Sequence, residues 1–386
     1  MLIYGTFAIT ALTIAILLLF FRKETKWWEL LIPVAVSVVV VLASLALAEF
    51  VAVTDTEYWG HLGATAVHEE PYSYMSTCTE SYPCGSDSKG NVTYCTRMYP
   101  CEQHVSRHCY LKFRKYDQSI YISYAKYKEL DARWHHNGYK FKQVHTDLHH
   151  RPHHGGKHVV RWDNKWETAE PIVQTHRYEN RVQASDSVFN FPEVDKEDID
   201  NYGLYEYPEV PGGYEMVSIL DHGKPRWKAD KYFRYLNGKL GPERRVRIWV
   251  AVFREKPLLA AKLQEAYWKG ANKNEFVFCI GTDKEDKVTW GHVISWSEVQ
   301  TLKIEARNYV SEMKELNEES MVQLAKWAEE NVGAKFIKKD FRDFDHLRVT
   351  PPTYMIVIAY ILVILANIGV SIFIVKNSYH DRYDRW

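Results

Sequence analysis

The chain lacks an excess of charge of either sign. Its 386 residues include 49 Lys and Arg and 49 Asp and Glu. Nucleic-acid-binding proteins normally carry a basic excess, so this balance argues against that class of partner. Apart from one pair of heptapeptides, the sequence also lacks an internal repeat, which argues against a solenoid.

The sequence also lacks the short motifs that usually mark an enzyme. No G-x-S-x-G, P-loop or G-x-G-x-x-G pattern occurs in it. The H-E-x-x-H pattern is missing as well, so a metalloprotease would have no general base in place. Ser, His and Asp are plentiful but show no triad context. The absences favour a protein that is not an enzyme.

Three long apolar runs interrupt the otherwise polar sequence. They cover Leu2–Phe21, Leu30–Val53 and Tyr354–Val375, and Glu49 is the only charge within them. About 20 apolar residues cross a bilayer core, so each run predicts a transmembrane helix. The first two form a helical hairpin over residues 1–53. A signal peptide cleaved after Ala46-Leu47-Ala48 is the alternative, but a full apolar run precedes it, which favours an uncut hairpin.

Short basic segments predict the orientation of these helices. The loop 22–29 carries Arg22, Lys23 and Lys26, and the tail 376–386 carries three further bases. By the positive-inside rule, the loop and the tail lie in the cytoplasm and residues 54–353 lie outside. Four bases at positions 338, 339, 342 and 348 oppose this orientation. The aromatic residues expected at the membrane interface are Trp27, Trp28, Tyr58, Trp59 and Tyr354.

The region between the helices divides by composition. We expect a Cys-rich stapled module at 54–109, a β-rich domain with a His-rich loop at 110–225, an α/β domain at 226–335 and a linker at 336–353. After residue 226 the order is strand, helix, two strands and two helices, which favours helices packed on a sheet. The predicted fold class is therefore a protein with three transmembrane helices and a mixed α/β (α+β) extracytoplasmic domain.

Five cysteines lie close together in the first module. They are Cys78, Cys84, Cys95, Cys101 and Cys109. The stretches CTESYPC (78–84) and CTRMYPC (95–101) repeat one pattern, and zinc knuckles usually have a shorter Cys spacing. An extracytoplasmic module favours disulfides. Turn-forming residues between the repeats favour pairs that join the two arms of a hairpin, with Cys109 left over. Local pairs and a zinc site remain the alternatives.

A run of histidines provides the second candidate site. It contains His145, His149, His150, His153, His154 and His158. If 145–150 is helical, His145 and His149 share one face and can bind zinc, copper or nickel. Pro152 and Gly155-Gly156 instead favour a solvated loop. Zinc is the only cofactor that the sequence suggests, either here or at the cysteines.

Three stretches carry a resemblance to a known family. TDTEYWG (54–60), HRYENRVQASDSVFNF (176–191) and NKNEFVFCIGTDKEDKVTWGHVISW (272–296) resemble an uncharacterised family of membrane-anchored proteins in phage and bacterial sequences. The arrangement of an α/β domain before a final membrane helix is also similar to TPM-type extracytoplasmic domains. The family has no assigned activity, so the resemblance implies no catalytic residues.

These observations predict a membrane-anchored surface or envelope protein. Its partners would be the lipid bilayer and either another protein or further copies of itself, because the abundant Tyr and Trp suit protein interfaces. One alternative is a metal-dependent extracytoplasmic enzyme that uses the His-rich loop. Another is a channel or transporter component, which would need oligomerisation because the apolar runs hold only Glu49 as a charge.

Overall fold

The chain forms two compact units. The computed structural model describes residues 2–21, 26–86, 92–115, 117–134, 141–146, 152–185, 191–210, 213, 215, 217–223 and 225–383. One unit comprises Met1–Glu57, Arg177–Glu193 and Asp340–Trp386, and the other comprises Tyr58–His176 and Val194–Lys339.

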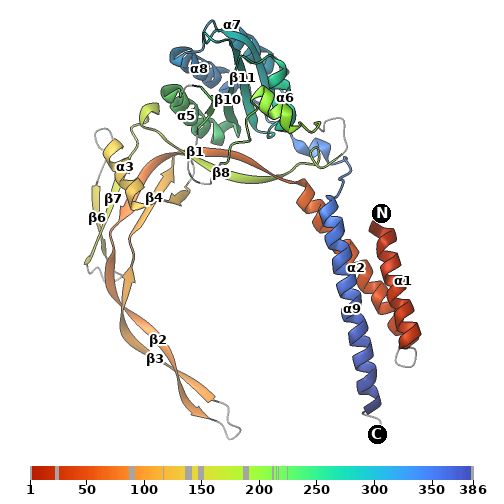
Figure 1. Ribbon diagram of the computed structural model, residues 1–386. Helices are drawn as coiled ribbons and strands as arrows, with labels where there is room; N and C mark the ends of the chain where they lie inside the picture. Colours follow the sequence, from red (N-terminus) through yellow and green to blue (C-terminus); the bar gives the residue numbers. More distant parts are fainter. Residues whose placement is uncertain are drawn as a thin grey trace. The chain divides into compact units, whose positions relative to one another are not determined.

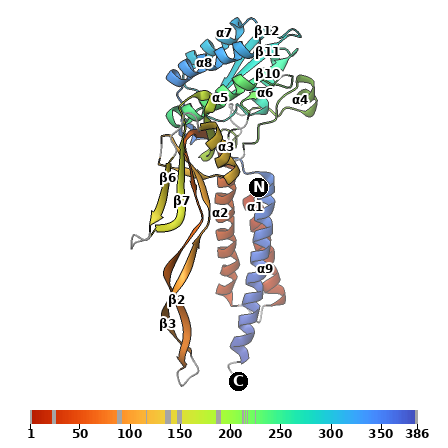
Figure 2. The same ribbon diagram turned by 90° about the vertical axis from the view of Figure 1, so that its left-hand side faces the viewer.

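Long apolar helices make up most of the first unit (Figures 1 and 2). They are α1 (Leu2–Phe20), α2 (Leu31–Val53), which the short helix η1 (Trp27–Leu30) precedes, and α9 (Thr353–Tyr383). The segments Trp27–Val53 and Thr353–Lys376 are long and apolar enough to cross a membrane. Their outward side chains are apolar and exposed, as at Val39 (65%) and Phe373 (60%). Water disfavours such a surface, whereas a bilayer suits it.

The prediction of three membrane spans is supported for two helices only. The apolar helix Tyr4–Phe20 falls in a shorter class than the other two. At 1.5 Å per residue it extends about 25 Å, less than the roughly 30 Å of a hydrocarbon core. Helix α1 nevertheless packs against both α2 and α9. Gly5 permits this close approach, because a Cβ there would meet the Tyr360 ring at 2.6 Å.

A buried polar cluster joins the three helices. The hydroxyls of Thr10 in α1 and Ser37 in α2 are 2.8 Å apart, and Asn367 Nδ2 of α9 donates to Ser37 Oγ at 2.8 Å. All three residues are at most 5% exposed. Hydrogen bonds of this kind hold apolar helices together where hydrophobic burial gives no advantage. The cluster therefore fixes the mutual register of α1, α2 and α9.

The same unit ties the ends of α2 and α9 to residues 177–193. Asp55 accepts hydrogen bonds from Tyr178 Oη and Asn180 Nδ2, both at 2.8 Å. Arg181 pairs with Glu49 of α2 at 3.0 Å. The short helix η3 (Phe341–Phe344) sets Phe341 edge-on to Tyr178. Charged and aromatic side chains thus replace the apolar surface at this end of the helices.

The second unit contains most of a six-stranded sheet with the strand order β5-β4-β1-β7-β6, in which β8 also pairs with β1. The strands are β1 (Thr54–Glu69), β4 (His108–Phe113), β5 (Ser119–Tyr121), β6 (Phe141–Thr146), β7 (Pro152–Arg161) and β8 (Glu170–Glu179), with the short helix η2 (Trp166–Thr168) between the last two. Helix α3 (Tyr124–Trp134) buries Tyr127, Leu130 and Trp134 against Leu111 and Val160.

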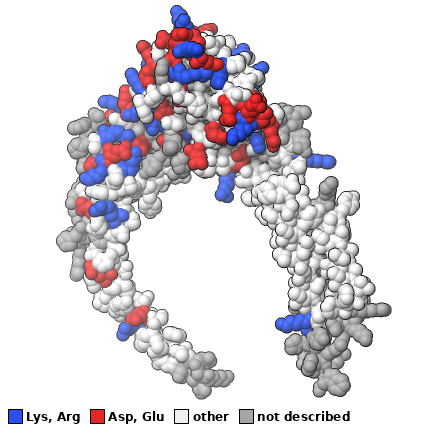
Figure 3. All heavy atoms as spheres, in the orientation of Figure 1, with Lys and Arg blue, Asp and Glu red and all other residues white. Residues whose placement is uncertain are grey.

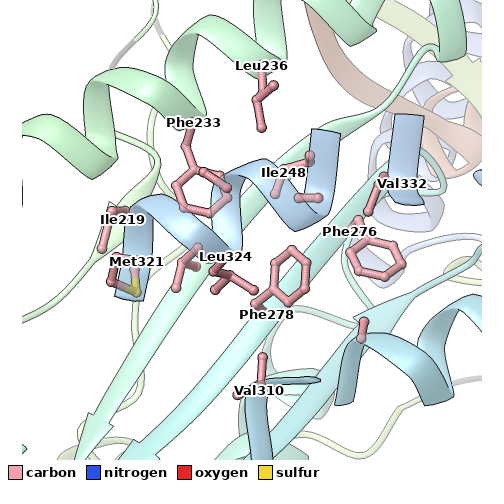
Figure 4. Packing of buried hydrophobic residues seen from close by; sticks show 14 of the residues in the cluster. Ile219, Phe233, Leu236, Ile248, Phe276, Phe278, Val310, Met321, Leu324 and Val332 are labelled. Atoms are coloured by element: carbon pink, nitrogen blue, oxygen red, sulfur yellow. The ribbon is translucent and has the colours of Figure 1, made fainter. Parts of the chain in front are cut away.

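The second unit also contains an α/β layer. Its sheet has the order β12-β11-β10-β9, with β9 (Ile219–Leu220), β10 (Arg247–Arg254), β11 (Glu275–Thr282) and β12 (Val288–Ser295). Alternate residues of β10 and β11 face opposite sides, and both sides are apolar because helices cover both. Helices α5 (Trp227–Arg244), α7 (Gln300–Glu312) and α8 (Glu318–Lys335) pack on Ile248, Phe276 and Phe278 (Figure 4). Helix α6 (Leu259–Tyr267) packs on the Trp249 side, near α4 (Lys196–Tyr202).

Charged side chains are buried where β10 and β11 begin. Arg247 and Glu215 are almost fully buried and form two contacts, at 2.6 and 3.3 Å. The Arg247 guanidinium lies 4.2 Å from the ring centroid of Trp249, whose Nε1 donates to Glu275 at 3.0 Å. Burial raises the pKa of Glu215 and of Glu275. Arg247 and the neighbouring hydrogen-bond donors act in the opposite direction but do not outweigh burial. Loss of the guanidinium would leave a carboxylate buried without a cation.

Candidate functional site

A two-stranded antiparallel ribbon stands out from the rest of the second unit. It comprises β2 (Tyr72–Ser86) and β3 (Val92–Val105), and among the described strands these two pair only with each other (Figures 1 and 2). The register runs from Tyr72 opposite Val105 to Ser86 opposite Val92. Two-stranded ribbons are marginally stable alone in water, so this one needs a further source of stability.

Two disulfides supply that stability. They join Cys78 to Cys101 and Cys84 to Cys95, with Cα atoms 5.7 and 5.6 Å apart. This is the pairing expected when both repeats lie on the arms of one hairpin. A closed loop of this size lowers the entropy of the unfolded chain, which stabilises the fold by about 3 kcal/mol per bridge. The register shifts between Pro83 and Gly85, so Cys84 lies in a bulge.

The two remaining cysteines are buried thiols. Cys109 in β4 lies opposite His68, and Cys279 lies within β11. Burial raises the pKa of both thiols, so neither is an activated nucleophile. Among the described residues, no group of three His, Cys, Asp or Glu is arranged to hold a metal ion. The zinc alternative also loses its thiolates, because four of its five cysteines form the disulfides.

The two faces of the ribbon differ in chemistry. Side chains alternate between the faces of a strand, and directly opposite residues share a face. The stapled face contains both disulfides, and at its centre Arg97 pairs with Glu80 at 2.8 Å. The open face contains the intervening residues: Met75, Thr77, Thr79, Ser81, Pro83, Tyr94, Thr96, Met98, Pro100 and Glu102.

Every residue of the open face is exposed. Its large side chains are among the most exposed apolar groups outside the helical unit, with Met75 at 65%, Tyr94 at 66% and Met98 at 77%. Glu102, near the base, is its only charged residue. Figure 3 shows charged side chains crowded over the α/β layer and sparse along the ribbon. Apart from Glu102, the open face is thus a continuous uncharged surface of Met, Tyr, Pro and hydroxyl side chains.

The edges of the ribbon are less suited to binding than its face. An outer strand edge normally presents N–H and C=O groups that can pair with another strand. Pro83 lies in β2 and Pro100 lies in β3. A proline fits a strand where its nitrogen points outward, so each outer edge lacks one donor. This arrangement opposes the addition of another strand and leaves the open face as the available surface.

Comparison with known proteins yields no identification. No protein family, curated protein or solved structure matches this chain. The resemblance to membrane-anchored phage and bacterial proteins, and to TPM-type domains, therefore stays a prediction.

Most of the predicted histidine site lies outside the part of the chain whose side chains the structure describes. His145 belongs to strand β6, so it shares no helical face with His149. His149 and His150 lie outside the described residues, as do the side chains of His145, His153 and His154. His158 in β7 lies opposite His68, and its Nε2 is 2.7 Å from Glu70 Oε1. The predicted loop is in large part a hairpin, because β6 and β7 pair with each other.

The aromatic residues predicted for the membrane interface separate into two groups. Trp27 and Trp28 lie in η1 just before α2, Tyr354 lies in the first turn of α9, and all three are exposed. Tyr58 and Trp59 instead lie in β1, where they contact protein. Tyr58 stacks on Tyr207 at 6.3 Å, and Trp59 stacks on His176 at 3.8 Å.

A concave site, separate from the ribbon, lies at the carboxyl end of β9. A cavity of about 460 Å³ there is lined by Tyr205, His222, Arg226 and Trp227, among other residues. Open α/β sheets commonly bind ligands at this edge. The lining carboxylate Asp221 is paired with the lining residue Arg226 at 3.5 Å and with the neighbouring Arg254 at 2.9 Å. Burial raises the pKa of Asp221, but hydrogen bonds from Arg254 and Gly223 outweigh it, and the pKa lies below its usual range.

The cysteines are recognisable in the sequence, but the surface that they support is not. Met75, Tyr94 and Met98 carry no motif, and each looks unremarkable alone. The available signal is the spacing of the cysteines, which places them on one face of β2 and β3. Disulfides that occupy one face of a hairpin leave the residues between them on the other.

Proposed function

We propose that the protein is a membrane-anchored recognition protein whose ribbon binds another protein through the open face. The observation that carries this proposal is an exposed, uncharged surface on a ribbon that two disulfides brace. Exposed apolar surface is costly in water and commonly marks an interaction site. Tyr and Met suit such a site because they bring large contact area, and Met adapts to its partner.

The proposal includes a topology. Helices α2 and α9 anchor the chain in the bilayer, the loop 22–29 and the C-terminal tail are cytoplasmic, and residues 54–353 are extracytoplasmic. The disulfides support this orientation because they persist in oxidising compartments. The basic residues of the loop and tail support it through the positive-inside rule. Trp27, Trp28 and Tyr354 would then lie at the membrane interface.

A photo-crosslinking experiment tests the recognition surface. A benzophenone amino acid replaces Met98 on the open face, and in a matched variant it replaces the neighbouring Tyr99 on the stapled face. The full-length chain is then irradiated in its native membrane. We expect protein adducts from position 98 at several times the yield from position 99. Equal yields, or no protein adduct at position 98, would contradict the proposal.

The topology has its own test. Intact membranes are treated with an impermeant thiol reagent after mild reduction, and the labelled peptides are mapped. Labelling of Cys78 and Cys101 from the extracytoplasmic side supports the orientation. Labelling only after the membrane is opened would reverse it, and would leave the recognition surface to be judged by the crosslinking result.

A further inference from the structure

The cavity at the carboxyl end of β9 has an unsatisfied arginine in its wall. Arg226 lines this cavity of about 460 Å³, and only 7% of the residue is exposed. Among the described residues, neither Nε nor Nη2 of its guanidinium has a hydrogen-bond partner. Its ion pair with Asp221, at 3.5 Å, is too long for a good hydrogen bond. Buried charged donors without an acceptor cost free energy, so the cavity favours a ligand that brings acceptors.

The two carboxylates in the cavity wall are already engaged by other donors. Asp221 accepts two hydrogen bonds from Arg254, at 3.0 and 2.9 Å, and one from a backbone N–H at 2.9 Å. Asp230 accepts hydrogen bonds from two backbone N–H groups and pairs with Arg234 at 2.9 Å. Both negative charges are thus committed elsewhere, and the positive charge of Arg226 remains for a ligand.

The place of the cavity in the fold also favours an anion. Strands β9 and β10 are parallel, and ligands of open α/β sheets lie outside the carboxyl ends of such strands. Helix α5 begins at Trp227, directly after Arg226, and the N-terminus of a helix carries a partial positive charge. Glu318 already accepts the Ala229 N–H of its first turn at 2.6 Å. Arg226 therefore supplies the principal contact to an anion.

The rest of the cavity wall suits an apolar or aromatic group. Ile219 and Pro225 line it, as does Trp227, which is 71% exposed. The rings of Tyr205 and His222, which also line it, stack with their centroids 4.3 Å apart. Small-molecule sites commonly measure roughly 300–1,000 Å³ and combine apolar walls with a few polar groups. This cavity therefore has room for an organic group beside a single oxyanion.

We propose that this cavity binds a small organic anion. Arg226 holds the carboxylate or phosphate group of the ligand, and Trp227 and Pro225 contact its apolar body. Arginine suits this role because its planar guanidinium donates two parallel hydrogen bonds to either oxyanion. The ribbon takes no part, so this ligand-binding function of the α/β layer is independent of the proposed recognition function.

Isothermal titration calorimetry on the full-length chain in detergent micelles tests this proposal, with titrations into empty micelles subtracted. The organic anions are phenyl phosphate and phenylacetate. Benzyl alcohol is their uncharged counterpart, and inorganic phosphate is an anion without an apolar body. We expect one of the organic anions to bind at least about tenfold more tightly than either control compound. The tighter of the two organic anions identifies the oxyanion that the site prefers.

Four variants assign the binding to the cavity. Arg226→Met should weaken binding of the organic anion at least about tenfold, and Arg226→Lys, which keeps the charge but not the planar fork, should weaken it less. Trp227→Ala should weaken binding of the organic anion but not of inorganic phosphate. Lys228→Met is the matched control, because it removes an exposed positive charge from the same turn of α5. It should change the affinity less than about twofold.

Urea unfolding shows whether each variant has folded. Tight binding of an organic anion that is lost in Arg226→Met and kept in Lys228→Met supports the proposal. Equal affinity for benzyl alcohol, unchanged affinity in Arg226→Met, or no binding of any compound up to roughly 10 mM overturns it. If Arg226→Met does not fold, Arg226→Lys and Trp227→Ala decide, and unchanged affinity in both overturns the proposal. The crosslinking result at position 98 is unaffected by any of these outcomes.

Discussion

Removal of one disulfide should loosen a defined part of the ribbon. The inner disulfide, Cys84–Cys95, closes the tip, and the outer disulfide, Cys78–Cys101, lies nearer the base. With Cys84→Ser and Cys95→Ser, residues 85–94 lose the bridge that closes them directly, while the outer bridge still joins the two strands nearer the base. The expected loss is about 3 kcal/mol of local stability. At 1.4 kcal/mol per tenfold change, this corresponds to opening that is about 100-fold more frequent.

Hydrogen–deuterium exchange with peptide-level mass spectrometry measures this change directly. Exchange should accelerate between the two bridges and at the tip, and it should stay unchanged in β10 and β11, whose residues are buried. The matched variant with Cys78→Ser and Cys101→Ser should accelerate exchange nearer the base and leave the tip closed. Unchanged exchange at the tip without the inner bridge would refute the view that the disulfides supply the stability of the ribbon.

Two further predictions concern the α/β layer. Arg247→Met should cost about 3–5 kcal/mol in urea unfolding, because it leaves Glu215 buried without a cation, and adding Glu215→Leu should recover most of that loss. Equal stability of the single and double variants would show that the pair is not coupled. Asp221→Asn should cost about 1.5–3 kcal/mol at pH 7, since it removes charged hydrogen bonds to Arg254. The pKa of Asp221 is lowered in the folded state, so its contribution is present above about pH 4, the usual pKa of an aspartate, and is lost as the pH falls through the folded value. Melting temperatures of the two proteins should therefore converge in acid, and a constant difference down to pH 2 would contradict this assignment.

The pattern of apolar residues predicted the α/β layer well, because its helices bury one apolar face and its central strands are buried on both sides. The first two strands expected after residue 226 correspond to β10 (Arg247–Arg254) and β11 (Glu275–Thr282). Apolar residues there follow from helices on both sides of the sheet, and burial of this kind is visible in sequence. Apolar composition also predicted that α1 crosses a membrane. The apolar helix Tyr4–Phe20 is shorter than the other two, so this span is not supported.

The longest strand of the other sheet, β1, was not visible in the sequence, whereas β7 and β8 lie in the region that was predicted to be β-rich. Strand β1 extends for 16 residues, yet its segment contains Gly60, Gly63 and two histidines. Gly60 is required by a close approach, since a Cβ there would lie 1.6 Å from the carbonyl oxygen of Ile172. Contacts between residues far apart in the chain override local propensity at such positions. The ribbon likewise lacks strand-like alternation, because both of its faces are largely exposed and hydrophobicity varies little between them.

The hydrogen bonds among Thr10, Ser37 and Asn367 have a consequence for how the chain is made. Asn367 follows Ser37 by 330 residues. At about 5–20 residues per second, the ribosome needs roughly 15–70 seconds to reach it. During this interval the first two helices carry a hydroxyl pair whose amide partner does not yet exist. The final helix therefore completes the helical unit, and a chain interrupted before α9 would keep that hydroxyl pair without its amide partner.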